Sequence, residues 1–379
     1  MQQKRVRAVK PRAVISLTTG SEEYTIELRD GHAYPKPGAP AKYDAFVETD
    51  PETFEAVQTG APGIEAFLDG RLRVRKNLAL AMQLDALLAG PTARRRGFAA
   101  RRVTAAGVDT FYLEVGSGPP VILLHGLGAT NASFLPTFWE LSRDHRVIAP
   151  DLPGHGESGK PIRAYHAGFY ARWCAEFMDA LGLRRAALIG NSMGGRIAIE
   201  VGFRYPEKVD RIIGLAPAAA FLKFRQWVPV VRLLRPELAW LPLTLPHSRV
   251  VRGARALFYK PDKLPLSWHL GAADEFLRIF NTPRGRIAFF SALREIYLDA
   301  PFGKHGFWER LNSLQPPTLF VWGDHDRLVP AKFARHVERE LPNARSVVMK
   351  DCGHVPQFEQ PEKTHKLIRE FLGEVAQAA

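Results

Sequence analysis

One six-residue segment, Gly190-Asn191-Ser192-Met193-Gly194-Gly195, constrains the fold of this chain more than any other. The apolar run at residues 186–189 predicts a buried strand before it, and residues 196–201 are compatible with a helix after it. In a sharp strand-to-helix turn with the pattern G-x-S-x-G, the serine is strained and its hydroxyl is exposed. The following helix directs its N-terminal N–H groups at the serine. The segment therefore predicts a nucleophilic Ser192, with an ordinary strand–helix turn as the alternative.

The rest of the chain from residue 103 onward predicts an α/β fold, because strands and helices alternate there as in a parallel sheet. Strands are expected at residues 111–115, 121–124, 147–149, 187–189, 212–215, 319–321 and 346–349. Helices are expected at residues 133–141, 165–181, 193–204, 331–341 and 363–376. The segment at about 216–312 interrupts this alternation with many aromatic residues and prolines, which favours a helical cap over a pocket.

The first 90 residues have a different pattern, which predicts a small α+β domain. Strands are expected at residues 13–17, 24–28, 45–49 and 72–75, with turns at residues 30–31 and 35–38. Helices are expected from residue 51, at residues 64–68 and at residues 78–88. Residues 91–102 are short and basic and are expected to be a linker, and a length of 379 residues fits two domains.

A serine hydroxyl needs a base beside it and an acid that orients the base. In folds with this nucleophile turn, the chain order is serine, acid, histidine. The expected strand at residues 319–321 is followed by Asp324 and Asp326, of which we favour Asp326 as the acid and assign Asp324 to the turn. His354 follows the last expected strand and is the predicted base, whereas His365 is expected on the surface of the terminal helix.

The developing oxyanion needs two backbone N–H donors. Met193 follows the nucleophile and is the first predicted donor. The second is expected in the loop His125-Gly126-Leu127-Gly128, with Leu127 as the donor and His125 fixing the loop by hydrogen bonding.

Metal and disulfide chemistry receive little support from the sequence. Asp151, His155 and Glu157 suggest metal ligands, but they lack a partner cluster at ligand spacing, so they are expected to shape a loop. We predict no metal and no cofactor. The only cysteines, Cys174 and Cys352, make no disulfide framework.

Taken together, the motifs at residues 125–128, 151–156, 190–195, 323–326 and 353–354 resemble the alpha/beta-hydrolase family in their order. The resemblance spans residues 103–379 and implies a mostly parallel sheet with helices on both faces and a cap. A serine nucleophile argues against the haloalkane dehalogenase and epoxide hydrolase branches of that family, whose nucleophile is an aspartate.

The N-terminal domain, residues 1–90, resembles the sterol-carrier-protein family at residues 46–49, 51–54, 60, 66–74 and 77–84. The resemblance implies a lipid-binding module without a catalytic residue. Such modules usually carry additional helical residues before the first strand, and only 12 residues precede Ala13 here, so we expect a trimmed module.

Three functions are compatible with these features. The leading hypothesis is a serine hydrolase that cleaves a hydrophobic or lipid-like carboxylic ester through an acyl-enzyme. The alternative is a carbon–carbon bond hydrolase of the ring-cleavage type, which this chain resembles at residues 190–195, although the oxyanion loop of such enzymes usually carries further Gly and Pro. The third is a non-enzymatic lipid-binding protein.

The charge distribution of the chain indicates which kinds of partner it is suited to bind. The net charge is +13, and residues 216–312 carry 15 Lys and Arg against 7 Asp and Glu. No nucleic-acid-binding motif is present, so this excess indicates either a solvated basic face or peripheral contact with an anionic membrane. Without an apolar signal-like segment or a membrane-spanning run, a cytoplasmic location is expected, and the oligomeric state is left open.

Overall fold

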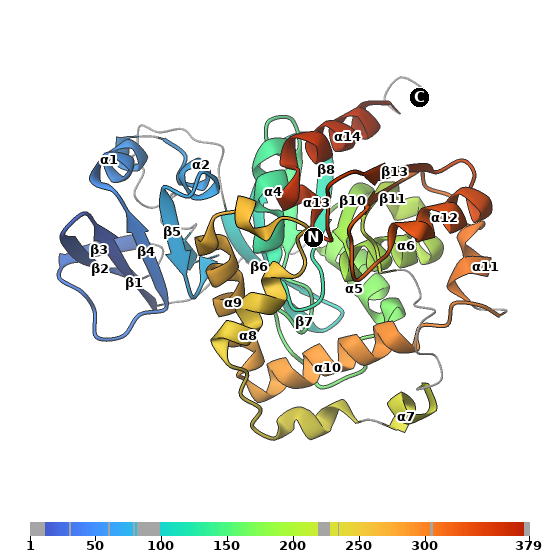
Figure 1. Ribbon diagram of the computed structural model, residues 1–379, viewed down its shortest axis with the longest axis horizontal. Helices are drawn as coiled ribbons and strands as arrows, with labels where there is room; N and C mark the ends of the chain where they lie inside the picture. The colour runs from blue at the N-terminus through green and yellow to red at the C-terminus, as the bar shows by residue number, and fades with distance from the viewer. Residues whose placement is uncertain are drawn as a thin grey trace.

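The computed structural model describes residues 12–29, 32–59, 61–78, 80–81, 99–218, 228–233, 235–303 and 306–374. These residues form a five-stranded sheet in the N-terminal unit and an eight-stranded sheet in the remainder (Figure 1). Within this part of the chain, no helix combines the length and the apolar character that a membrane span requires.

The N-terminal unit has the expected α+β architecture. Its sheet has the order β3-β2-β1-β4-β5, and only the β1–β4 pair is parallel. The elements are β1 (Arg12–Thr19), β2 (Glu22–Arg29), β3 (His32–Pro37), β4 (Ala45–Thr49), α1 (Pro51–Thr59), α2 (Gly63–Leu68) and β5 (Leu72–Arg75). Asp50 begins α1 as an N-cap, because its Oδ1 accepts the Thr53 N–H at 2.7 Å.

One expected turn in this unit is wrong. Residues 35–37 belong to strand β3, in which Pro35 lies opposite Ile26 and Pro37 opposite Tyr24. A proline lacks the N–H that a central strand needs, but β3 is the edge strand, where this loss is tolerated. The residues before Arg12, most of the helix expected at residues 78–88, and residues 91–98 of the expected linker lie outside the described residues.

The larger sheet has the order β13-β12-β11-β10-β8-β9-β7-β6. Its strands β13 to β9 run parallel, and β7 and β6 are antiparallel additions. The strands are β6 (Ala99–Ala105), β7 (Val108–Val115), β8 (Pro120–Leu124), β9 (Arg146–Pro150), β10 (Ala186–Asn191), β11 (Val209–Leu215), β12 (Thr318–Gly323) and β13 (Arg345–Met349).

Strand β6 was not among the expected strands, and it begins inside the expected linker. Its arginines remain compatible with a strand because they lie at the sheet edge and have acidic neighbours. Arg101 pairs with Glu114 at 3.0 Å, and Arg102 pairs with Asp109 at 2.7 Å. The basic composition that suggested a linker is therefore accommodated by cross-strand ion pairs.

Helices cover both faces of this sheet, as expected. On one face lie α5 (Ala167–Ala180), α6 (Met193–Arg204) and α12 (Ala334–Glu340), and on the other α4 (Leu135–Leu141) and α14 (Pro361–Glu374). His365 on α14 is buried, not on the surface, and its Nε2 lies 3.1 Å from Thr137 Oγ1. It lies on the buried face of α14 three residues before Ile368, and this burial lowers its pKa to about 4.

The cap is helical, as expected. It contains α7 (Val228–Leu233), the 3₁₀ segment η4 (Pro236–Trp240), α8 (His247–Arg255), α9 (Leu266–Phe280), α10 (Pro283–Leu298) and α11 (Phe307–Leu311). Aromatic rings from α9 and α10 pack edge-to-face, for example Phe276 with Phe289 at 5.4 Å between centroids. Figure 1 shows α9 beside β5 of the N-terminal unit, so this helix of the cap lies between the two sheets.

Candidate active site

The turn at Ser192 has the geometry that its sequence pattern predicts. Ser192 joins β10 to α6 with φ 53° and ψ −117°, a strained conformation for a residue with a side chain. A Cβ on Gly194 would lie 1.8 Å from the Leu124 carbonyl oxygen, and one on Gly190 would lie 2.2 Å from the Gly194 carbonyl carbon. Only glycine fits these two positions, so they hold the serine in place.

His354 and Asp326 form the buried pair that the sequence proposed. His354 Nδ1 lies 2.7 Å from Asp326 Oδ2, and the two residues are 4% and 7% exposed. The other oxygen, Asp326 Oδ1, accepts the backbone N–H groups of Leu328 at 2.8 Å and Val329 at 2.9 Å. These two bonds fix the carboxylate and leave Oδ2 to accept from the imidazole.

Asp324, the competing acid, has other partners. It is exposed, its Oδ1 accepts the Cys352 N–H at 3.2 Å, and it lies beside the ring of His325. These contacts are those of a residue that stabilises the turn. Cys352 is buried, which raises the pKa of its thiol to about 12 and leaves it protonated near neutral pH.

Asn191 connects the serine turn to the histidine loop. Its Nδ2 donates to the carbonyl oxygens of Leu215 and His354, both at 3.0 Å. The His354 N–H in turn donates to the Leu257 carbonyl oxygen of the cap at 2.7 Å. No role was expected for Asn191, although an amide side chain next to Ser192 at the end of a strand was a usable signal.

The loop at residues 125–128 lies against Ser192. His125 is buried, its Nε2 accepts the Leu152 N–H at 2.9 Å, and burial lowers its pKa to about 3, so the ring is neutral. This agrees with its expected part in fixing the loop. A Cβ on Gly126 would lie 3.4 Å from the Ser192 Cβ, and the next residue, Leu127, lines the same cavity as Ser192.

That cavity has a volume of about 670 Å³ and contains Ser192 and His354 in its wall. Most of the remaining wall is aliphatic or aromatic. It comes from the cap (Leu245, Val250, Leu257, Phe258, Leu264, Trp268, Phe276, Phe289, Leu293, Ile296), from the unit built on the larger sheet (Leu127, Ala132, Val329, Val355, Phe358) and from the N-terminal unit (Phe67, Val74, Leu78). The last group was not foreseen from the sequence.

The segment considered for a metal shapes a loop. Asp151 accepts the backbone N–H of Asn131 at 2.9 Å and that of Glu157 at 2.7 Å, and burial raises its pKa to about 6. Among the described residues, no three His, Cys, Asp or Glu side chains are grouped so that they could hold a metal ion.

Comparisons with known proteins agree with this architecture. Residues 119–361 match the alpha/beta hydrolase fold family, and residues 2–89 match the SCP-2 sterol transfer family. A 2-hydroxy-6-oxo-2,4-heptadienoate hydrolase of Pseudomonas putida is 28% identical over 283 residues, 72% of this chain and 95% of that protein.

Two similar solved structures are a membrane phospholipase A, described as a bacterial virulence factor, and the meta-cleavage product hydrolase CumD of Pseudomonas fluorescens. The phospholipase is 29% identical with a TM-score of 0.61, over 74% of this chain and 87% of that one. CumD is 28% identical with a TM-score of 0.61, over 72% of this chain and 97% of that one.

Proposed function

Because this chain belongs to the alpha/beta-hydrolase family, we propose that it is a serine hydrolase that cleaves a hydrophobic or lipid-like carboxylic ester through an acyl-enzyme. One observation carries the proposal. Ser192 and His354 line one largely apolar cavity, and His354 Nδ1 is held 2.7 Å from the buried carboxylate of Asp326.

In the proposed reaction, Ser192 Oγ attacks the ester carbonyl carbon while His354 Nε2 takes its proton. The proton passes to the leaving alcohol as the ester bond breaks, and a water molecule activated by His354 then hydrolyses the acyl-serine. Asp326 accepts the Nδ1–H, so Nε2 is free to accept a proton. We assign the backbone N–H groups of Met193 and Leu127 to the oxyanion, because α6 begins at Met193 and the Leu127 loop lies against Ser192.

A carbon–carbon bond hydrolase is the second candidate, because a heptadienoate hydrolase and CumD are among the similar proteins. A dienoate carries a carboxylate, and binding one in an apolar cavity requires a cationic partner. Among the cavity-lining residues described, Arg249 is the only lysine or arginine, and it is exposed. The apolar wall therefore favours an uncharged ester.

A substrate comparison tests these alternatives. Purified protein is assayed with p-nitrophenyl esters of increasing acyl length and with a vinylogous diketone, and Ser192→Ala is the control for the active serine. We expect hydrolysis of the esters and none of the diketone. A preference for the diketone contradicts the ester proposal, and a wild-type protein that neither turns over nor is labelled at Ser192 by a fluorophosphonate supports a purely lipid-binding role.

We also propose that the cap contacts an anionic lipid surface. Large apolar side chains between residues 228 and 243 are exposed, namely Val230, Leu233, Leu238, Trp240, Leu241 and Leu243. The exposed Arg232 and Arg235 are interspersed among them. The buried Arg286 fixes this segment by donating to the Ala239 and Trp240 carbonyl oxygens at 2.9 and 3.1 Å. Exposed aromatic and aliphatic residues among arginines are typical of segments that bind acidic lipid interfaces.

A further inference from the structure

The N-terminal unit contributes directly to the cavity that contains the nucleophile. Phe67 of α2, Val74 of β5 and Leu78 line that cavity together with Ser192 and His354. The unit therefore forms part of the cavity wall, because its apolar side chains face the space that a substrate would occupy.

A tryptophan of the cap joins this wall to the catalytic loop. The Trp268 ring stacks on Phe67 at 6.1 Å between centroids, and its Nε1 donates to the Phe67 carbonyl oxygen at 3.1 Å. The Trp268 ring also packs edge-to-face with Phe358, with 5.1 Å between the ring centroids. Phe67, Trp268 and Phe358 all line the cavity, so one aromatic row runs from the N-terminal unit to the segment just after His354.

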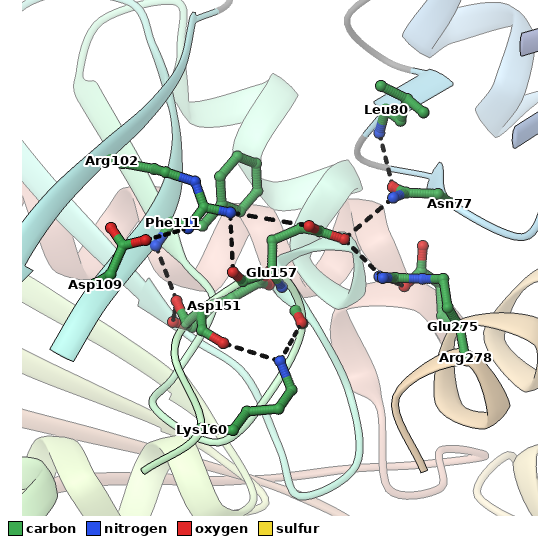
Figure 2. Close-up of polar contacts among 12 residues, drawn as sticks. Asn77, Leu80, Arg102, Asp109, Phe111, Asp151, Glu157, Lys160, Glu275 and Arg278 are labelled. Carbon is green, nitrogen blue, oxygen red and sulfur yellow. Dashed lines mark hydrogen bonds and ion pairs between the residues drawn. The ribbon is translucent and has the colours of Figure 1, made fainter. Parts of the chain in front are cut away.

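A buried polar cluster fixes the unit in this position (Figure 2). It consists of Asn77 from the N-terminal unit, Glu157 from the loop after β9, and Glu275 and Arg278 from α9. Glu157 Oε1 accepts from Asn77 Nδ2 at 3.2 Å and from Arg278 Nη1 at 2.6 Å. Glu275 accepts the Leu78 N–H at 2.7 Å and the Arg278 Nη2 at 2.8 Å. Asn77 and Glu275 are buried, and removing Arg278 would leave the Glu275 carboxylate without its cationic partner, so the cluster favours a single docked arrangement.

A neighbouring carboxylate on α9 reinforces this contact. Asp274 pairs with Arg75 at 2.5 Å and also accepts the Lys76 N–H at 3.3 Å. Asp274 and Glu275, which are adjacent on α9, thus bind the segment at residues 75–78. This segment connects the cavity-lining residues Val74 and Leu78. Hydrogen bonds to α9 therefore fix Val74 and Leu78 relative to the cap helix that lines the same cavity.

The hydrophobic core of the N-terminal unit also extends onto helix α4 of the larger unit. Leu135 of α4 belongs to the same buried cluster as Ile15, Val47 and Phe67 of the N-terminal unit. Trp139 on the same helix packs against this cluster and donates from Nε1 to Glu65 Oε1 at 3.0 Å.

From these contacts we infer that the N-terminal unit is a specificity-determining wall of the active site, in which Phe67, Val74 and Leu78 limit the length of the apolar group that fits. The inference rests on the proposed esterase function. The favoured substrates are esters with a long apolar chain that extends from Ser192 toward the N-terminal unit. The chain would occupy the cavity shared by both units.

The test adds a bulky side chain at the cavity wall of the N-terminal unit. The matched control adds the same side chain at a position of that unit that does not line the cavity. Leu78→Trp adds bulk at the cavity, whereas Arg73→Trp adds the same side chain at an exposed position of β5 that is absent from the cavity lining. We expect Leu78→Trp to lower the ratio of kcat/KM for p-nitrophenyl palmitate to that for p-nitrophenyl acetate by about tenfold or more. Arg73→Trp should leave the ratio within about twofold. The inference is refuted if the palmitate-to-acetate ratio of kcat/KM is the same in the two variants.

Two further measurements distinguish a failure of this inference from a failure of the proposed ester hydrolysis. Phe67→Ala widens the wall and should raise the same ratio, which keeps the test valid if thermal unfolding shows that Leu78→Trp does not fold. Fluorescence-detected binding of an uncharged pyrene-labelled fatty alcohol reports occupancy of the cavity without catalysis. If esters are not hydrolysed but Leu78→Trp weakens probe binding relative to Arg73→Trp, the esterase proposal fails and the shared wall stands. If probe binding is the same in both variants, the wall is refuted.

Discussion

Replacing Asp326 by asparagine tests the proposed triad through a single proton. The Asp326 Oδ1 accepts two backbone N–H groups, at 2.8 and 2.9 Å, so an asparagine at this position keeps its own oxygen there. Its NH₂ group then replaces Oδ2, which lies 2.7 Å from His354 Nδ1. An NH₂ group only donates, so Nδ1 must become the acceptor and the ring proton moves to Nε2. In that tautomer the Nε2 atom of His354 carries the proton and has no lone pair with which to take the Ser192 proton.

The expected loss is large although the fold is kept. The same tautomer reversal in Ser-His-Asp triads lowers kcat by about 10⁴-fold, which corresponds to about 5.4 kcal/mol of transition-state stabilisation. We expect a loss of this size for Asp326→Asn in p-nitrophenyl ester hydrolysis, with a similar decrease in the rate of fluorophosphonate labelling. The melting temperature should change little, because the side chain keeps its size and its two backbone bonds.

Asp324→Asn is the matched control, two residues away in the same loop. Asp324 is exposed and its Oδ1 accepts from the Cys352 N–H, a bond that an asparagine oxygen also makes. Its kcat should stay within about threefold of the wild type. The tautomer argument is refuted if Asp326→Asn retains a tenth or more of the wild-type kcat, or if Asp324→Asn is the variant that loses activity.

Three other outcomes are expected. Ser192→Ala and His354→Ala should each abolish most ester hydrolysis, and the double variant should be no worse than either alone, because the two residues act as a unit. Burial lowers the pKa of His365 to about 4, so this residue should account for about 3 kcal/mol of the unfolding free energy that the wild type loses as pH falls from 6.5 to 4, and urea denaturation of His365→Asn should lack this part of the loss. Binding to anionic vesicles should weaken with added salt and in the Leu233→Ser, Trp240→Ser double variant; sedimentation that is unchanged in that variant would contradict the proposed lipid contact.

The sequence was sufficient wherever structure depends on neighbours along the chain. The turn at Ser192 follows from local sterics, because a Cβ at Gly190 or Gly194 would overlap the backbone. The alternation of strands and helices predicted the sheet, and the loops after β12 and β13 placed Asp326 and His354 close together at one sheet edge, where the carboxyl ends of parallel strands meet.

The tertiary structure decided what depends on segments far apart in the chain. Prolines lie in β3 because that strand is at the edge of its sheet, and His365 is buried because α14 packs against α4. The cavity wall at Phe67 and Val74 lies more than a hundred residues from Ser192 in sequence, and no local pattern places either residue beside Ser192. Their position follows from how the two units dock, which is set by polar contacts with α9 and by the packing of Leu135 into the N-terminal core, and no periodicity along the chain encodes these contacts.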